Sequence, residues 1–96
     1  MSHAEISHSR LTHSDLSYVN LSHARLASVD LSNSSLVGAI LSDAEFMSVD
    51  LSGANLQQAD LSGANLKGVI GITIEELEKQ AKSLQGAILP DGSKHP

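Results

Sequence analysis

Residues 52–66 read SGANLQQADLSGANL, in which an alanine is followed two positions later by a leucine three times in succession. The leucines Leu56, Leu61 and Leu66 are five residues apart. The same spacing continues toward the amino terminus, so that large apolar residues follow one another in a single register. We call these positions the centres, and they are Ile6, Leu11, Leu16, Leu21, Leu26, Leu31, Leu36, Leu41, Phe46, Leu51, Leu56, Leu61 and Leu66.

A spacing of five residues fits neither a continuous helix nor a continuous strand. On an α-helix, successive centres would be rotated by about 140° and would form no stripe. On an extended strand, an odd spacing would place successive centres on opposite faces. The chain is therefore expected to bend once in every five residues, with each centre and the small residue two positions before it pointing inward.

The residues that follow each centre have the composition of a corner. Serine, asparagine and glycine recur there, and these residues either bond to the local backbone or tolerate a positive φ. Repeated corners wind the chain into a coil whose turns stack about 4.8 Å apart and pair their backbones. The sequence thus predicts an all-β solenoid, and the spacing alone leaves three or four sides per coil open.

Residues 52–56, 59–63 and 64–66 resemble the signature of the pentapeptide-repeat family, which is Ala-(Asp/Asn)-Leu followed by two variable residues. The resemblance implies a right-handed quadrilateral β-helix, with four repeats in each coil, over residues 1–70. Some units depart from the signature, and the residue before the centre is apolar at Ile40.

Residues 71–96 leave the register and are expected to form a capping helix and a tail. Thr73 and Glu76 have the spacing of a capping box, and Ile72 and Leu77 have that of a hydrophobic staple. We expect a short C-terminal capping α-helix over residues 74–83, with one apolar stripe that covers the open end of the last coil. The residues of this stripe are Ile74, Leu77, Ala81 and Leu84.

The segment after the predicted helix returns to the repeat in degenerate form. Leu84 and Leu89 are five residues apart, residues 90–92 read Pro-Asp-Gly and predict a turn, and the last few residues are expected to fray. This ending is similar to those of cyanobacterial and chloroplast pentapeptide-repeat proteins.

The amino-terminal end has no matching cap in the sequence. The first coil would expose Ile6, Leu11 and Leu16 together with unpaired backbone groups, and such an edge is a route to pairing with another chain. We therefore expect an end-to-end homodimer through the uncapped N-terminal coil as one mode of assembly.

Composition excludes several classes of protein. The absence of cysteine excludes disulfides and thiolate chemistry, and 11 acidic against 6 basic residues give a net charge of −5, which argues against direct nucleic-acid binding. No apolar run has the length of a membrane span, and no signal peptide is recognisable, so we expect a cytoplasmic protein with no membrane partner. No catalytic or cofactor motif is present, so we expect neither an enzyme nor a bound cofactor.

Histidines form a candidate column on the outside of the predicted coil. In the four-sided arrangement His3, His23 and Asp43 would stack about 5 Å apart, a spacing at which two imidazoles and a carboxylate could hold a divalent metal ion. The alternative interpretation is that these are solvated corner residues. Charged residues also stack in the predicted register, with Arg25 between two glutamates, an alternation that favours the register of the coils.

Exposed apolar residues are the stronger indication of binding. Val37, Ile40 and Met47 occupy outward positions that are otherwise polar, and we expect a contact with an unidentified protein partner there. The leading hypothesis is a non-enzymatic structural or protein-interaction module that presents flat faces. The alternatives are a DNA mimic that inhibits or protects DNA gyrase, as some members of the family are, and surface binding of a divalent metal ion through the histidine column.

Overall fold

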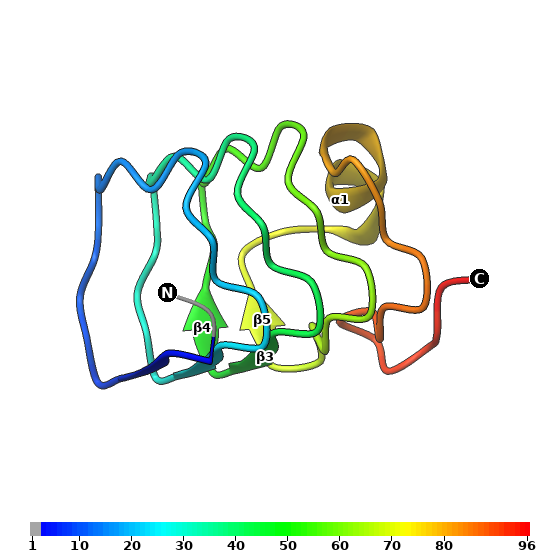
Figure 1. Cartoon of the computed structure of the whole chain (residues 1–96), viewed down its shortest axis with the longest axis horizontal. Helices are drawn as coiled ribbons and strands as arrows, with labels where there is room; N and C mark the ends of the chain where they lie inside the picture. Colours follow the sequence, from blue (N-terminus) through cyan, green and yellow to red (C-terminus); the bar gives the residue numbers. More distant parts are fainter. Residues whose placement is uncertain (1–2) are drawn as a thin grey trace.

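The computed structural model describes residues 3–96, and its chain winds as a β-helix whose coils stack from the amino to the carboxyl end (Figure 1). Neighbouring coils pair in parallel with partners twenty residues apart, so each coil contains four centres. The strands are short because every fifth residue turns a corner. They are β1 (Glu5–Ser7), β2 (Arg25–Ala27) and β3 (Glu45–Met47) in one sheet, and β4 (Val49–Asp50) and β5 (Val69–Ile70) in a second.

The corners have a repeated backbone conformation. The residue two positions after a centre is left-handed, as at His23 with φ 61° and Gly63 with φ 68°. Residues other than glycine occupy this position after nine of the centres, although the left-handed conformation costs each of them roughly 1–2 kcal/mol. Gly68 differs, since its φ is not in that range and the backbone of Phe46 approaches too closely to leave room for a side chain.

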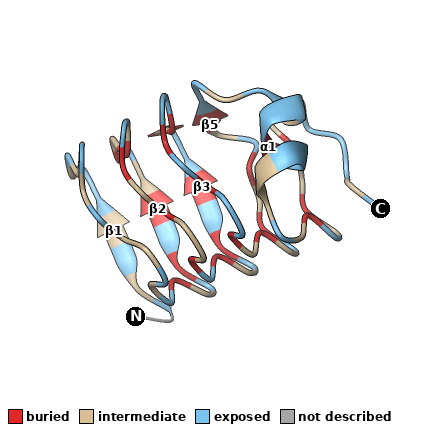
Figure 2. Cartoon of the chain, turned by 90° about the horizontal axis from the view of Figure 1, so that it is seen from above, coloured by how far each residue is buried: buried red, intermediate tan, exposed pale blue. Residues whose placement is uncertain are grey.

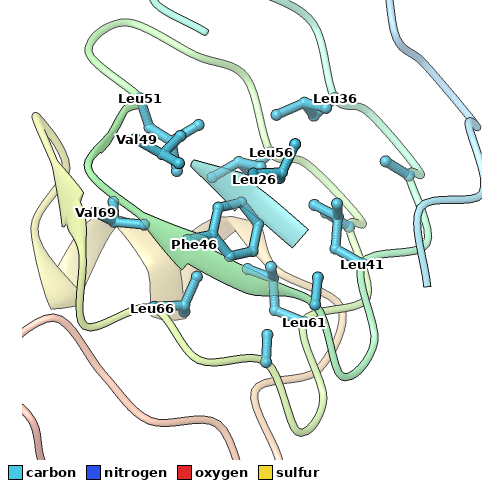
Figure 3. Packing of buried hydrophobic residues seen from close by; sticks show 14 of the residues in the cluster. Leu26, Leu36, Leu41, Phe46, Val49, Leu51, Leu56, Leu61, Leu66 and Val69 are labelled. Atoms are coloured by element: carbon cyan, nitrogen blue, oxygen red, sulfur yellow. The ribbon is translucent and has the colours of Figure 1, made fainter. Parts of the chain in front are cut away.

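The centres form one continuous core (Figure 3). From Leu21 to Leu66 every centre is at most 2% exposed, and the alanines and valines two positions before them share the interior. Figure 2 shows this burial falling off toward the amino-terminal coil. Leu11 and Leu16, which the periodicity assigns to the core, are only partly buried because no coil covers them on that side within the described residues.

The predicted capping helix begins where the sequence indicates but ends earlier. Helix α1 (Ile74–Gln80) has Thr73 as its N-cap, and the side chain of Thr73 forms the predicted capping box with Glu76. The prediction of residue 83 as its end was wrong, because Ala81 has extended φ and ψ and ends the helix. Leu84 therefore does not lie on the helix.

The four residues of the predicted apolar stripe have different surroundings. Leu77 is fully buried, Ala81 packs against the core, and Ile74 is only partly buried. Leu84 is 6% exposed and lies in a segment that resumes the pairing of the coil, as the bridges of Asp60 with Ser83 and of Asn65 with Ile88 show.

The carboxyl-terminal tail closes this end of the coil. After the turn at residues 90–92 the chain folds back in antiparallel fashion, with a bridge between Ile88 and Lys94. The backbone of His95 accepts a hydrogen bond from Gly86 and donates one to Ala87, at 2.9 and 2.8 Å. The expectation of a frayed ending was wrong for His95 because both of its backbone groups are paired. Within residues 3–96, no helix has the length and hydrophobicity needed to cross a membrane.

Candidate functional site

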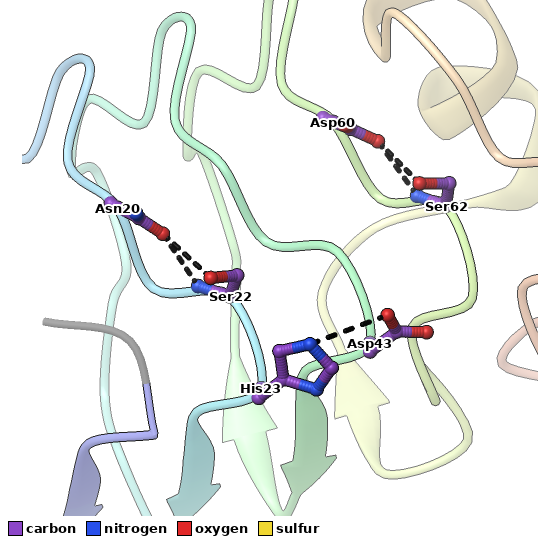
Figure 4. A network of polar contacts seen from close by, with 6 residues as sticks. All are labelled: Asn20, Ser22, His23, Asp43, Asp60 and Ser62. Carbon is purple, nitrogen blue, oxygen red and sulfur yellow. Dashed lines mark hydrogen bonds and ion pairs between the residues drawn. The ribbon is translucent and has the colours of Figure 1, made fainter.

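The outward residue before each centre has a structural task at most positions. Where it is Asp or Asn, its Oδ1 accepts a hydrogen bond from the backbone amide two residues later, as in Asn20 with Ser22 and Asp60 with Ser62 (Figure 4). The serine hydroxyl donates to the same oxygen in these two cases. Such turns span 2.9–3.1 Å and occur at Asp15, Asn20, Asp30, Asp50, Asn55, Asp60 and Asn65.

These turns explain the recurring Asp or Asn in the repeat, a role that the sequence reasoning above missed. The signal was present in the triplets Asp-Leu-Ser and Asn-Leu-Ser, in which the acceptor and the donor flank the centre. The hydroxyl and amide of Ser32, with a further contribution from Arg10, hold the pKa of Asp30 below its usual range. The hydroxyl and amide of Ser17 lower the pKa of Asp15 in the same way. These carboxylates therefore stay ionised and support the backbone.

Ile40 interrupts this system. It pairs with Asn20 on one side and Asp60 on the other, and both of those residues support a turn. The side chain of Ile40 has no oxygen that could accept a hydrogen bond from the amide of Ser42. Ile40 is 39% exposed. An apolar side chain here forgoes a hydrogen bond and places hydrocarbon in solvent.

Tyr18 lies at the corner two residues before Asn20, the residue that pairs with Ile40, and the sequence analysis did not single it out. It is the most exposed of the large apolar residues within the described part of the chain, at 76%. Its ring covers Gly38, where a Cβ would collide with the ring carbons, and its amide donates to Val37 at 2.8 Å. The alignment of an aromatic corner residue with a glycine twenty positions later was the available signal. We define the Tyr18–Ile40 patch as Tyr18, Val37 and Ile40; Val37 itself is half-buried.

The structure does not bring Met47 into this patch. Met47 is 41% exposed and stands in register with Ala27, while Ile70, at 60%, pairs with Asp50. Met47 and Ile70 flank a corner half a coil away from Gly38, so they lie on the opposite side of the β-helix. Met47 and Ile70 therefore provide an exposed apolar surface outside the Tyr18–Ile40 patch that can serve as a control.

The predicted histidine column is present as a stack. The rings of His3 and His23 have centroids 4.9 Å apart with planes 12° from parallel, and His23 Nε2 lies 3.7 Å from Asp43 Oδ2 (Figure 4). Parallel rings direct their nitrogen lone pairs side by side, whereas a metal ion needs them to converge on one point. Among residues 3–96, no cluster of three or more His, Cys, Asp or Glu could hold a metal ion.

A groove of about 490 Å³ lies between the end of α1 and the tail. It is lined by Glu78, Ser83 and His95, a combination of side chains that invites comparison with a hydrolase triad. However, His95 Nε2 faces Glu78 at 3.5 Å and its Nδ1 lies 3.0 Å from a backbone oxygen of Pro96. Because both ring nitrogens have partners, neither is left to activate the serine hydroxyl.

Comparison with known proteins agrees with this geometry. The model of pentapeptide repeats matches eight copies over residues 4–43 and 44–70. A pentapeptide repeat protein from the thylakoid lumen of Arabidopsis thaliana is 24% identical, with a TM-score of 0.52, over 92% of this chain and 59% of that chain. This likeness supports a right-handed β-helix.

Two cyanobacterial structures from Nostoc PCC 7120 also match. HetL, a pentapeptide repeat protein involved in the regulation of heterocyst differentiation, is 36% identical with a TM-score of 0.48. The match covers 95% of this chain and 43% of HetL, so the chain spans less than half of that protein's length. A second pentapeptide repeat protein is 29% identical, with a TM-score of 0.48, over 84% of this chain and 83% of its own.

No match was found among curated proteins. The family model alone spans more than half of the residues, in the register that the centres define. The chain therefore belongs to the pentapeptide repeat family.

Proposed function

We propose that this chain is a non-enzymatic protein-interaction module, built as a four-sided β-helix that presents its outer surface to a protein partner. The four sides follow from the register of twenty residues together with one corner in every five. The coils pair their backbone groups with one another, and no buried side-chain polar atom among the described residues lacks a hydrogen-bond partner, so the scaffold leaves no buried side-chain polar group for a ligand to satisfy.

The observation that supports binding is Ile40 within the Tyr18–Ile40 patch. Asn20 and Asp60, which pair with Ile40 in the two neighbouring coils, each support a turn with their side chain, and Ile40 cannot. Tyrosine combines a large apolar area with low conformational entropy and is enriched among the residues that dominate protein interfaces. Asn20 and Asp60 provide a polar rim. We infer that a partner places an apolar side chain against Tyr18 and Ile40.

The experiment separates binding from folding by using a substitution that improves the scaffold. Ile40→Asn recreates the side chain of Asn20 and should restore the missing turn, so it should not destabilise the chain. Affinity capture from the native source, quantified for each partner by mass spectrometry, should show at least a tenfold loss for Ile40→Asn and for Tyr18→Ser. The double variant Met47→Ser/Ile70→Ser alters the opposite surface and should retain the partners. Equal recovery with Ile40→Asn and wild type would refute the patch.

The two alternatives find less support in the geometry. The molecule is 31 Å long, and duplex DNA of that length would carry about 18 phosphate charges, against the net charge of −5 here. That difference disfavours a DNA mimic. The histidine stack does not converge on a metal position, so metal binding has no specific observation in its favour.

A further inference from the structure

Charge is distributed unevenly over the four sides of the β-helix. Within residues 3–70 all the lysines and arginines belong to two neighbouring sides, and they are Arg10, Arg25 and Lys67. The Tyr18–Ile40 patch lies on the other two sides, which are built from residues 15–22, 35–42 and 55–62. Those residues contain no lysine or arginine, and their only acidic residues are Asp15 and Asp60. The two sides that carry the patch are therefore purely negative.

The carboxylates of Asp15 and Asp60 lie on either side of the patch. Asp60 pairs with Ile40 of the neighbouring coil. Asp15 lies on the adjoining side, just before the corner of Tyr18. Oδ1 of Asp60 accepts hydrogen bonds from the amide and the hydroxyl of Ser62 at 3.0 and 2.7 Å, which leaves its Oδ2. Among residues 3–96 neither carboxylate forms an ion pair with a basic side chain, so both can accept a cation from a partner.

Two backbone amides in the patch have no hydrogen-bond acceptor. In the next coil the amides two residues after Asn55 and Asp60 donate to those side chains. The equivalent amides of the patch, at Val37 and Ser42, donate no hydrogen bond within residues 3–96. Both residues are half-buried. Oxygen atoms of a partner can therefore supply the acceptors that the side chains of this coil do not.

An extended peptide carries groups that complement all of these features. Its successive side chains point to opposite faces, so side chains two positions apart share a face and are about 6.6 Å apart. Its backbone carbonyls lie along its edges, where they can accept hydrogen bonds from unpaired amides. When an apolar side chain of such a peptide contacts Tyr18 and Ile40, the side chains two positions before and after it lie on the same face as the two carboxylates. Lysine or arginine there meets an opposite charge, whereas an acidic residue meets a like charge.

We propose that the Tyr18–Ile40 patch binds an extended segment of a partner protein in which an apolar residue has lysine or arginine two positions before it and two positions after it. This inference rests on the proposed function and adds the chemistry of the partner segment. The apolar contact supplies affinity, and the two carboxylates select the flanking cations. The two unpaired amides donate to backbone carbonyls of the segment.

Synthetic peptides with blocked ends test the proposal directly. The probe is Gly-Arg-Ser-Leu-Ser-Arg-Gly, titrated into the isotope-labelled chain and followed by nuclear magnetic resonance through the amides of Val37 and Ser42. A rearranged peptide, Gly-Ser-Arg-Leu-Arg-Ser-Gly, has the same composition but directs its arginines to the face opposite the leucine. A neutral peptide, Gly-Ser-Ser-Leu-Ser-Ser-Gly, lacks the charge. We expect both to bind at least fivefold more weakly than the probe.

Substitutions that keep the turns remove the charge from the chain. The double variant Asp15→Asn/Asp60→Asn retains an acceptor oxygen at each position, as Asn55 does, and should weaken binding of the probe at least tenfold. The double variant Asp30→Asn/Asp50→Asn makes the same change on another side of the β-helix and should leave the affinity within twofold. Circular dichroism of each variant establishes that it is folded.

Four results would overturn the inference. They are no binding of the probe at several millimolar, equal binding of the rearranged or neutral peptide, unchanged binding by Asp15→Asn/Asp60→Asn, and an equal loss with Asp30→Asn/Asp50→Asn. The same variants separate this inference from the proposed function when native partners are captured. Partners that are lost with Ile40→Asn but kept with Asp15→Asn/Asp60→Asn would refute the selection of cations and leave the patch as the interface.

Discussion

The side chain of Gln80 takes the place of a missing coil above Leu56. Its Oε1 accepts the amide hydrogen of Leu56 at 2.8 Å. At the equivalent position one coil earlier, the amide of Leu36 donates to the backbone carbonyl of Asn55, also at 2.8 Å. The side chain of Gln80, at the end of helix α1, thus supplies the acceptor that a backbone carbonyl of the next coil supplies elsewhere in the β-helix.

Replacing Gln80 tests this substitution of side chain for backbone. Gln80→Ala leaves the Leu56 amide without its acceptor in a partly buried position, and we expect a loss of about 1–3 kcal/mol in the free energy of unfolding. Lys79→Ala, at the neighbouring exposed position of the helix, is the control and should change stability by less than about 0.5 kcal/mol. Urea denaturation followed by circular dichroism measures both. Equal stability of the two variants would mean that the hydrogen bond contributes nothing.

Ile40→Asn should stabilise the chain while it weakens binding. The new Oδ1 can accept the Ser42 amide as Asn20 accepts that of Ser22, a gain of about 0.5–1.5 kcal/mol. Thermal unfolding should therefore shift upward relative to wild type. A lower melting temperature would contradict the view that Ile40 sits in a turn-supporting position at the expense of stability.

Truncation of the centres should reveal a gradient along the axis. Leu56→Ala removes a fully buried side chain and should cost about 2–5 kcal/mol. Leu11→Ala should cost about 1–2 kcal/mol, because its side chain is only partly buried. Denaturant unfolding followed by circular dichroism compares the two. Equal costs would show that the first coil is covered.

Acid should destabilise the chain through Asp30. Its pKa is lowered in the folded state by the hydroxyl and amide of Ser32, so the unfolded chain binds a proton more readily. The stabilisation is present above the unfolded pKa of about 3.9 and is lost as the pH falls through the lower folded pKa. Asp30→Asn keeps an acceptor oxygen and should flatten the dependence of unfolding free energy on pH below about 5. An unchanged slope in that variant would refute the role of Asp30.

Much of the scaffold follows from the sequence because its determinants are local. The centres at every fifth residue and the corner residues behind them depend on neighbours within one repeat. The start of α1 does too, since the bonds between Thr73 and Glu76 join residues three apart. The family resemblance then correctly indicated the β-helix.

What the sequence did not predict depends on contacts between coils. Gln80, the last residue of α1, accepts a hydrogen bond from Leu56, 24 residues earlier in the chain. Tyr18 covers Gly38, twenty residues later. The placement of Met47 and Ile40 on opposite sides of the β-helix likewise depends on the register of twenty residues between coils, which spacing along the chain does not determine. Periodicity along the chain gives the repeat, but which exposed side chains meet depends on how the coils stack.

The stacking of residues twenty apart is the central claim, and nuclear Overhauser contacts in solution test it most directly. The account predicts contacts between the methyl groups of Leu36 and Leu56, and between the amide proton of Ile40 and the α-proton of Val19, whose carbonyl accepts that amide at 2.8 Å. Contacts that instead joined residues about fifteen apart, as three five-residue sides per coil would require, would contradict the four-sided coil and with it the proposed function.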